Sequence, residues 1–286
     1  MFMTDVYRPR AYYGTRKNGS QAVSLDLDDL REIVFNAYAF FEGGGYLVDA
    51  FGYHCVDRGY EPGYVGSDID VFVRLTLFRK DLWPIKDTYS FYSEDDCFTI
   101  LEFLYDHVSK PADKHYHDWD HCGWHYSNFN KQLGREEFRA KLTVPLERYG
   151  TGWELTEAGE IVSLPPSGMK TLVNAPLPTN DKTTQDKVAD ALMKYRRHGA
   201  SISDRRDAVR DLADVLEWLR PSIKEALLKE DEQELFKIAN NFGIRHMNQN
   251  QKLQYDQAVW LSWMFYHYLN TIYAFLHILK RQGITV

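Results

Sequence analysis

The chain has 286 residues, a net charge of −7, and 44% hydrophobic against 26% charged residues. This balance excludes a disordered chain, and the negative charge excludes nucleic-acid binding by the protein as a whole, so that any such role requires a local basic patch. Three widely spaced cysteines and the lack of an apolar signal segment predict a cytoplasmic protein without a disulfide framework.

The N-terminal half is predicted to be helical. Ser24 is the expected N-cap of a helix that continues to Phe41 and ends at three glycines, 43–45. We interpret these glycines as a helix end and turn, because no Gly-Lys-Ser/Thr sequence of a phosphate-binding loop follows them. Further helices are predicted over residues 46–56, 67–79, 93–108 and 135–149.

Local signals indicate how some of these elements begin. Ser67 or Asp68 is the expected first residue of one helix, and Ser93 is the expected start of the next. The stretch 151–164 alternates around Glu157-Ala158-Gly159-Glu160 and is the only segment in which we predict a β-hairpin.

Residues 115–125, HYHDWDHCGWH, are rich in metal-ligand side chains. Zinc would suit such a set, and His117, His121 and His125 are its candidate ligands. The spacing, however, matches neither CxxC nor HExxH, and no second ligand pair follows at a standard distance. We therefore predict no metal and no cofactor, and we favour an aromatic-rich packed loop whose histidines bind the backbone.

The four prolines in residues 164–181 predict a linker between two domains. The domains are then residues 1–163, with helices and one small hairpin, and residues 182–286, an antiparallel helical bundle. The fold class is mostly α. In the second domain Asp181 or Thr183 is the expected start of a helix that continues to about residue 198. Further helices are expected over residues 204–220 (ended by Pro221), 222–229, 232–241 and 256–281.

The last of these helices is the most apolar in the chain. His267, Asn270 and His277 interrupt its apolar run, which excludes a membrane span. We interpret His267 and His277 as core histidines with satisfied hydrogen bonds. Because apolar residues cover more than one face of the helix, we expect a homodimer formed through the C-terminal bundle.

Two polar features of the C-terminal part are candidates for function. The polar segment, residues 240–252, lies between two helical patterns and carries Asn241, Arg245, His246 and Asn248. The basic strip could bind the phosphates of RNA, or it could be a solvated helix face paired with Asp190, Asp204, Asp207 and Asp211. The strip extends from Lys182 to Arg210, and its candidate nucleic-acid-binding residues are Lys194, Arg196, Arg197, Arg205 and Arg206.

The sequences DRRDAVRDLADVLEWLR, LFKIANNFGIRHMNQNQ and YDQAVWLSWMFYHYLNTIYAFL resemble the C-terminal, HEPN-like helical domain of bacterial abortive-infection (AbiJ-like) proteins. FTILEFLYDHVSKP, HCGWHY and YGTGWELTEAGEIVSL are similar to the variable N-terminal domains of these proteins. The resemblance extends over residues 25–282. It implies a role in anti-phage defence, and many HEPN domains are metal-independent ribonucleases that act as dimers.

The family motif is an Arg, often followed by a polar residue, with a His four to six positions after the Arg. This chain departs from it, because Arg245 and His246 are adjacent. A ribonuclease would therefore require Arg205 or Arg206 to supply a guanidinium from another helix.

In such a site His246 would transfer a proton, Arg245 would stabilise charge on the phosphoryl oxygens, and Asn241 or Asn248 would orient the phosphate. Two alternatives remain open. Arg245 and His246 could only cap and bridge two helices, or the protein could be a non-catalytic sensor or scaffold that binds nucleic acid, a nucleotide or a protein partner.

Overall fold

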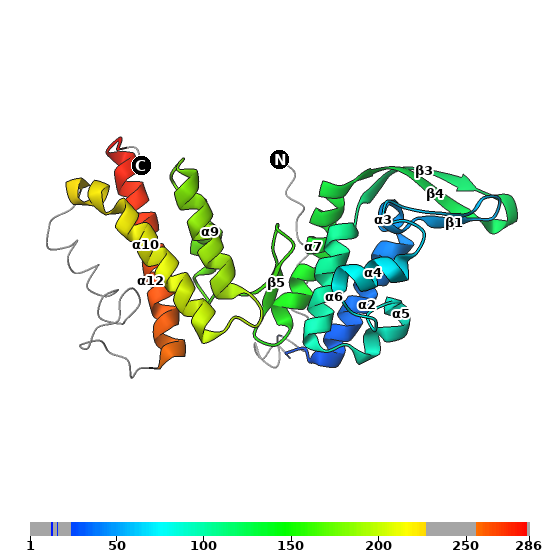
Figure 1. Ribbon diagram of the computed structural model, residues 1–286, viewed down its shortest axis with the longest axis horizontal. Coiled ribbons are helices and arrows are strands. Elements are labelled where there is room, and N and C mark those ends of the chain that lie inside the picture. Colours follow the sequence, from blue (N-terminus) through cyan, green and yellow to red (C-terminus); the bar gives the residue numbers. More distant parts are fainter. Residues whose placement is uncertain (1–12, 14–15, 17–23, 227–255, 285–286) are drawn as a thin grey trace. The chain divides into compact units, whose positions relative to one another are not determined.

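The computed structural model describes residues 13, 16, 24–226 and 256–284, and the chain divides into two compact units, residues 1–161 and 162–286 (Figure 1). The described residues are mostly helical, and their strands form small two-stranded sheets. The prediction of a mostly α protein is confirmed. Each unit has a hydrophobic core of its own.

The first unit contains helices and short hairpins. The helices are α2 (Leu27–Gly43), α3 (Val48–Phe51), α4 (Ile69–Leu77), α5 (Ile85–Thr88), α6 (Glu94–His107) and α7 (Lys131–Arg148). Its strands are β1 (Tyr53–Cys55), β2 (Gly59–Glu61), β3 (Lys110–His117), β4 (Gly123–Asn130) and β5 (Trp153–Leu155), and β6 (Ile161–Ser163) begins at its last residue and continues into the second unit. The sheets pair β1 with β2, β3 with β4, and β5 with β6, so the predicted hairpin over 151–164 is confirmed.

Capping side chains determine where the helices begin. Asp68 caps α4 and Ser93 caps α6, as predicted. The prediction of Ser24 as the cap of α2 is wrong, because Asp26 accepts a hydrogen bond from the backbone N–H of Asp29 (3.0 Å), while the Asp29 carboxylate accepts one from the backbone N–H of Asp26 (2.9 Å). This reciprocal capping box satisfies two helix-end donors.

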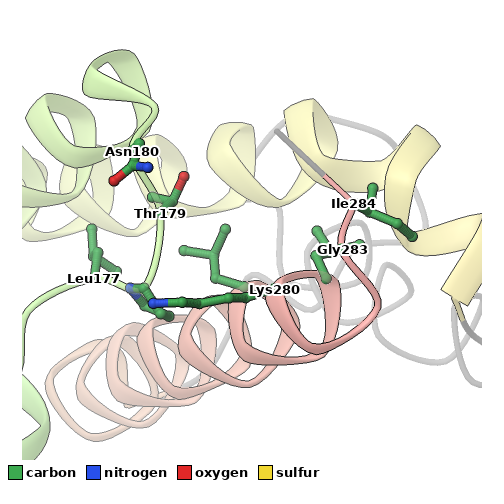
Figure 2. A pocket seen from close by; sticks show the side chains of 9 residues that line it. Leu177, Thr179, Asn180, Lys280, Gly283 and Ile284 are labelled. Carbon is green, nitrogen blue, oxygen red and sulfur yellow. The ribbon is translucent and has the colours of Figure 1, made fainter.

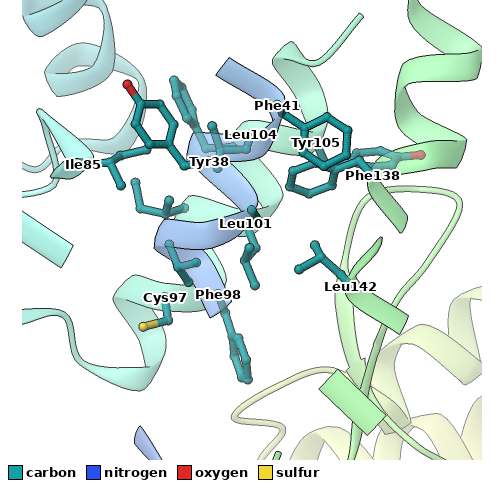
Figure 3. Packing of buried hydrophobic residues seen from close by; sticks show 14 of the residues in the cluster. Tyr38, Phe41, Ile85, Cys97, Phe98, Leu101, Leu104, Tyr105, Phe138 and Leu142 are labelled. Carbon is teal, nitrogen blue, oxygen red and sulfur yellow. The ribbon is translucent and has the colours of Figure 1, made fainter. Parts of the chain in front are cut away.

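The core of the first unit lies where α2, α6 and α7 pack together (Figure 3). Phe138 of α7 is fully buried, and its ring centroid lies 4.9 Å from that of Phe41 in α2. Leu101 of α6 and Leu142 of α7 are buried beside them. Helix α7 also packs against β3 of the β3–β4 hairpin.

Two of the hairpins were not predicted. Residues 46–56 do not form one helix: α3 ends at Phe51, and Gly52 follows with φ 76°. A Cβ at Gly52 would lie 2.1 Å from the carbonyl oxygen of Glu61, so the close approach of β2 requires glycine. Residues 115–125 form the end of β3, a turn and the start of β4, which corrects the predicted packed loop.

The second unit contains α8 (Lys170–Asn174), α9 (Lys182–Arg196), α10 (Ile202–Ala226) and α12 (Gln257–Arg281). Asp181 caps α9 as predicted, and α12 begins where expected, after Asp256. The predicted helix end at Pro221 is wrong, because α10 continues through it to bury Leu219 and Ile223 in the second core. The helix predicted over residues 232–241 lies outside the described residues. The end of the helix predicted over residues 222–229 lies outside them as well.

Helix α10 packs against both α9 and α12, and in Figure 1 α9 runs opposite to the other two. The ring of Tyr195 at the end of α9 stacks on Phe265 of α12, with centroids 3.9 Å apart. No helix in the part of the chain that the structure describes combines the length and apolar character needed to cross a membrane. The buried residues of the second core come from α8, α9, α10 and α12.

Candidate functional site

In sequence, the polar segment lies between the end of α10 at Ala226 and the start of α12 at Gln257. Its candidate catalytic residues Asn241, Arg245, His246 and Asn248 lie outside the described residues. The structure does place the start of α12, where Asp256 accepts hydrogen bonds from the backbone N–H groups of the first turn. The residues around this helix start are the described residues that follow the polar segment most closely in sequence.

Arg206 lies at the start of α12. Its Nη2 donates a hydrogen bond to Oε1 of Gln257, the first residue of the helix, over 3.0 Å. In sequence, the polar segment ends at Lys252, five positions before Gln257, while Arg206 lies far from both in the chain.

The neighbouring Arg205 is half-buried. Its guanidinium carbon lies 5.7 Å from the centre of the Tyr195 ring, a geometry that favours a cation–π interaction. Its Nε is buried and has no hydrogen-bond partner within the described part of the chain. Together, Arg205 and Arg206 place positive charge where α10 and α12 begin.

Some of the other residues of the basic strip form contacts that stabilise the fold. Lys194 forms an ion pair with Asp211 of α10. Arg196 is only 5% exposed, and its Nε donates a hydrogen bond to the carbonyl oxygen of Ser163 over 2.9 Å. Arg197, directly after α9, is exposed. Arg196 therefore has a structural role, and the exposed phosphate-binding candidate at this end of α9 is Arg197.

A cavity of about 880 Å³ lies beside α12, between this helix and the segment that contains α8. The ring of His267 stacks on Trp263, with centroids 5.0 Å apart and planes 5° from parallel. His267 Nε2 is buried without a partner among the described residues, and burial lowers the His267 pKa, which favours the neutral ring. His277 also lines the cavity but is exposed, so the prediction that both are satisfied core histidines is wrong.

A smaller cavity of about 280 Å³ lies at the other end of α12 (Figure 2). Thr179, Asn180 and Lys280 bring polar groups to it, and Leu177 and Ile284 contribute apolar surface. The cavity is next to the last turn of the helix, where the carbonyl groups disfavour an anion. We assign it no function.

In the first unit, the histidines of residues 115–125 separate into two groups. His117 and His125 converge with Cys122 and with Cys55 of β1, and the ligand atoms of these four side chains all lie within 4.8 Å of one another. His115 and His121 are exposed and do not belong to this group. Sequence reasoning missed Cys55 because 62 residues separate it from His117.

The candidate residues are thus distributed over both units. Of those predicted, the structure brings His117 and His125 together and places Arg206 at the start of α12. Burial lowers the pKa of His125, which favours the neutral ring that a metal binds. The chain matches no protein-family model, no curated protein and no solved structure.

Proposed function

We propose that the C-terminal unit cleaves RNA without a metal ion and that this activity serves anti-phage defence. The proposal rests on the resemblance to HEPN-like domains of abortive-infection proteins together with one observation. Arg206 is hydrogen-bonded to Gln257, which puts a guanidinium at the first residue of α12, five positions after the end of the polar segment in sequence. A separated arginine is what the adjacent pair Arg245 and His246 lacks when compared with the family motif.

The chemistry needs only side chains that this chain provides. In RNA the 2′-oxygen attacks the adjacent phosphorus and its proton passes to His246, while the bond to the 5′-oxygen of the next nucleotide breaks and that oxygen takes a proton from water. The products are a 2′,3′-cyclic phosphate and a free 5′-hydroxyl. Arg206, with Arg245, stabilises the negative charge that builds up on the phosphoryl oxygens.

The Arg206→Ala substitution is expected to lower the rate of cleavage by about 10²- to 10³-fold, because one donor to the developing charge is lost. The measurement is cleavage of total cellular RNA by the purified chain in EDTA. The matched control is Arg210→Ala, since Arg210 lies on the same helix and pairs with Asp207 (2.9 Å). Equal rates for Arg206→Ala and the unsubstituted chain would remove Arg206 from the site.

A second candidate function is non-catalytic binding of a nucleotide. The cavity beside α12 favours it, because the exposed ring of Trp263 lines this cavity and suits stacking on a planar base. Tyr266 and Asn270 line the same cavity. In this second candidate function the bundle is a sensor that binds a nucleotide and does not cleave RNA.

Trp263→Ala is expected to weaken nucleotide binding about tenfold, since stacking on an aromatic ring contributes about 1–3 kcal/mol per base. Isothermal titration calorimetry with ATP and with GTP measures the change in the dissociation constant. Trp218→Ala is the control, because Trp218 is 63% exposed on α10 and does not line the cavity. Binding that is equally tight in both variants would place the nucleotide elsewhere.

A further inference from the structure

Four side chains from two hairpins of the first unit point their donor atoms at one another. Cys122 Sγ lies 3.1 Å from His125 Nε2, and Cys55 Sγ lies 3.9 Å from His117 Nδ1. In a tetrahedral zinc site, bond lengths of about 2.3 Å to sulfur and about 2.1 Å to nitrogen separate two such ligands by about 3.6 Å. The two observed distances lie on either side of this value.

The turn between β3 and β4 gives Cys122 its place. His117 pairs with Gly123 in the sheet, and the backbone reverses through Asp120 (φ 48°) and His121 (φ 54°). Two successive non-glycine residues in the left-handed region are uncommon and cost free energy, so other interactions must hold this turn. The turn brings Cys122 between two histidines that come from opposite strands.

This hairpin has almost no hydrophobic core. Among residues 110–130, all of which the structure describes, His125 alone is buried. Cys55 is only 2% exposed, yet it does not belong to the hydrophobic core of its unit. A two-stranded hairpin is marginally stable in water, and here the buried side chains that could stabilise it are ligand types.

A carboxylate orients one of the four side chains. Asp57, in the turn between β1 and β2, lies 3.2 Å from Nε2 of His117 through its Oδ2, and this contact leaves Nδ1 facing Cys55. A carboxylate on the second ring nitrogen is typical of metal-bound histidines, because it fixes the ring and makes the ligand more basic. The ring of Tyr53 packs against His125, with centroids 4.8 Å apart.

We propose that Cys55, His117, Cys122 and His125 bind one Zn²⁺, which fastens the β1–β2 hairpin to the β3–β4 hairpin. Two thiolates and two neutral imidazoles are ligands that zinc prefers, and the thiolates cancel the charge of the ion, which suits a partly buried site. Four protein ligands leave no position for a substrate, so the ion is structural. A single thiol–imidazole hydrogen bond would explain Cys122 and His125 but not the convergence of all four side chains.

The test measures zinc in the full-length chain, expressed without a histidine tag and purified in reducing buffer. We expect one zinc per chain, and almost none in His125→Gln or in Cys55→Ser/Cys122→Ser. The matched control is His121→Gln, because His121 lies in the same turn but outside the cluster. Folded unsubstituted chain that holds well under one zinc after incubation with it, or equal zinc in His121→Gln and His125→Gln, would overturn the proposal.

Two further readouts keep the test informative if a ligand variant fails to fold. Asp57→Asn leaves all four ligands in place and is expected to weaken zinc binding about 10- to 100-fold in competition with a chelator. Removing zinc from the unsubstituted chain is expected to speed amide hydrogen exchange in residues 110–130 while exchange in α6 stays unchanged. Unchanged affinity in Asp57→Asn would contradict the orienting contact, and unchanged exchange in the hairpin would contradict the structural role.

Discussion

Replacing His246 with alanine is expected to lower the rate of metal-independent RNA cleavage by about 10²- to 10⁴-fold, the usual contribution of a general acid–base group. Histidine is the side chain in the polar segment that can both accept and release a proton near neutral pH. The measurement is single-turnover cleavage of a labelled RNA, together with plating of phage on cells that express either chain. Protection of the cells should be lost together with cleavage.

The control for this prediction is His277→Ala, because His277 is an exposed histidine of α12 that lies outside the candidate catalytic set. Cleavage that persists unchanged in His246→Ala would move the site away from the polar segment.

A chelator in the cleavage assay would also remove the zinc proposed for the first unit. The assay is therefore repeated without chelator in Cys122→Ser, which lacks only the structural zinc. Cleavage that is lost in chelator but kept in this variant would indicate a catalytic metal.

Helix starts could be predicted from sequence because capping is local chemistry. Asp68, Ser93, Asp181 and Asp256 each accept hydrogen bonds from N–H groups two or three residues further along the chain. A short sequence window contains all the atoms of such a cap. The same reasoning placed the cap of α2 at Ser24 instead of Asp26, because several residues of capping type follow one another there.

The elements that could not be predicted depend on contacts between distant residues. The extended strand after Gly52 is determined by its approach to Glu61, and the continuation of α10 through Pro221 by the burial of residues on both sides of the proline. A proline inside a helix costs about 3 kcal/mol, which local rules treat as a helix end. Burial of Leu219 and Ile223 in the second core is the tertiary gain that opposes this cost.

For the candidate sites, too, signals from neighbouring residues could be recognised in the sequence, whereas contacts between distant residues could not. Three candidate metal ligands were named within residues 115–125, but the prediction of no metal rested on the spacing of that stretch and on the lack of a second ligand pair after it. Spacing rules describe ligands that neighbour each other in sequence, whereas Cys55 reaches the cluster from another hairpin. Likewise, nothing in the sequence around Arg206 indicates that its side chain bonds to Gln257.

Replacing Phe138 with alanine is expected to lower the free energy of unfolding of the first unit by about 3–5 kcal/mol, the usual cost of removing a buried phenylalanine ring. Phe138 is fully buried, and its ring centroid lies 4.9 Å from that of Phe41 and 6.5 Å from that of Tyr105. Deleting it leaves a cavity where α2, α6 and α7 meet. Denaturant unfolding of the full chain measures the change, and amide hydrogen exchange locates it.

The matched control is Leu133→Ala, because Leu133 lies on the same helix but is 42% exposed, and a loss of about 1 kcal/mol or less is expected there. Exchange should accelerate in α2, α6 and α7, while α9, α10 and α12 keep their protection because their core is separate. A small effect of Phe138→Ala would mean that α7 does not close the first core. Loss of protection in both units would mean that the two cores unfold together, and a mutation far from the bundle could then reduce RNA cleavage through stability alone.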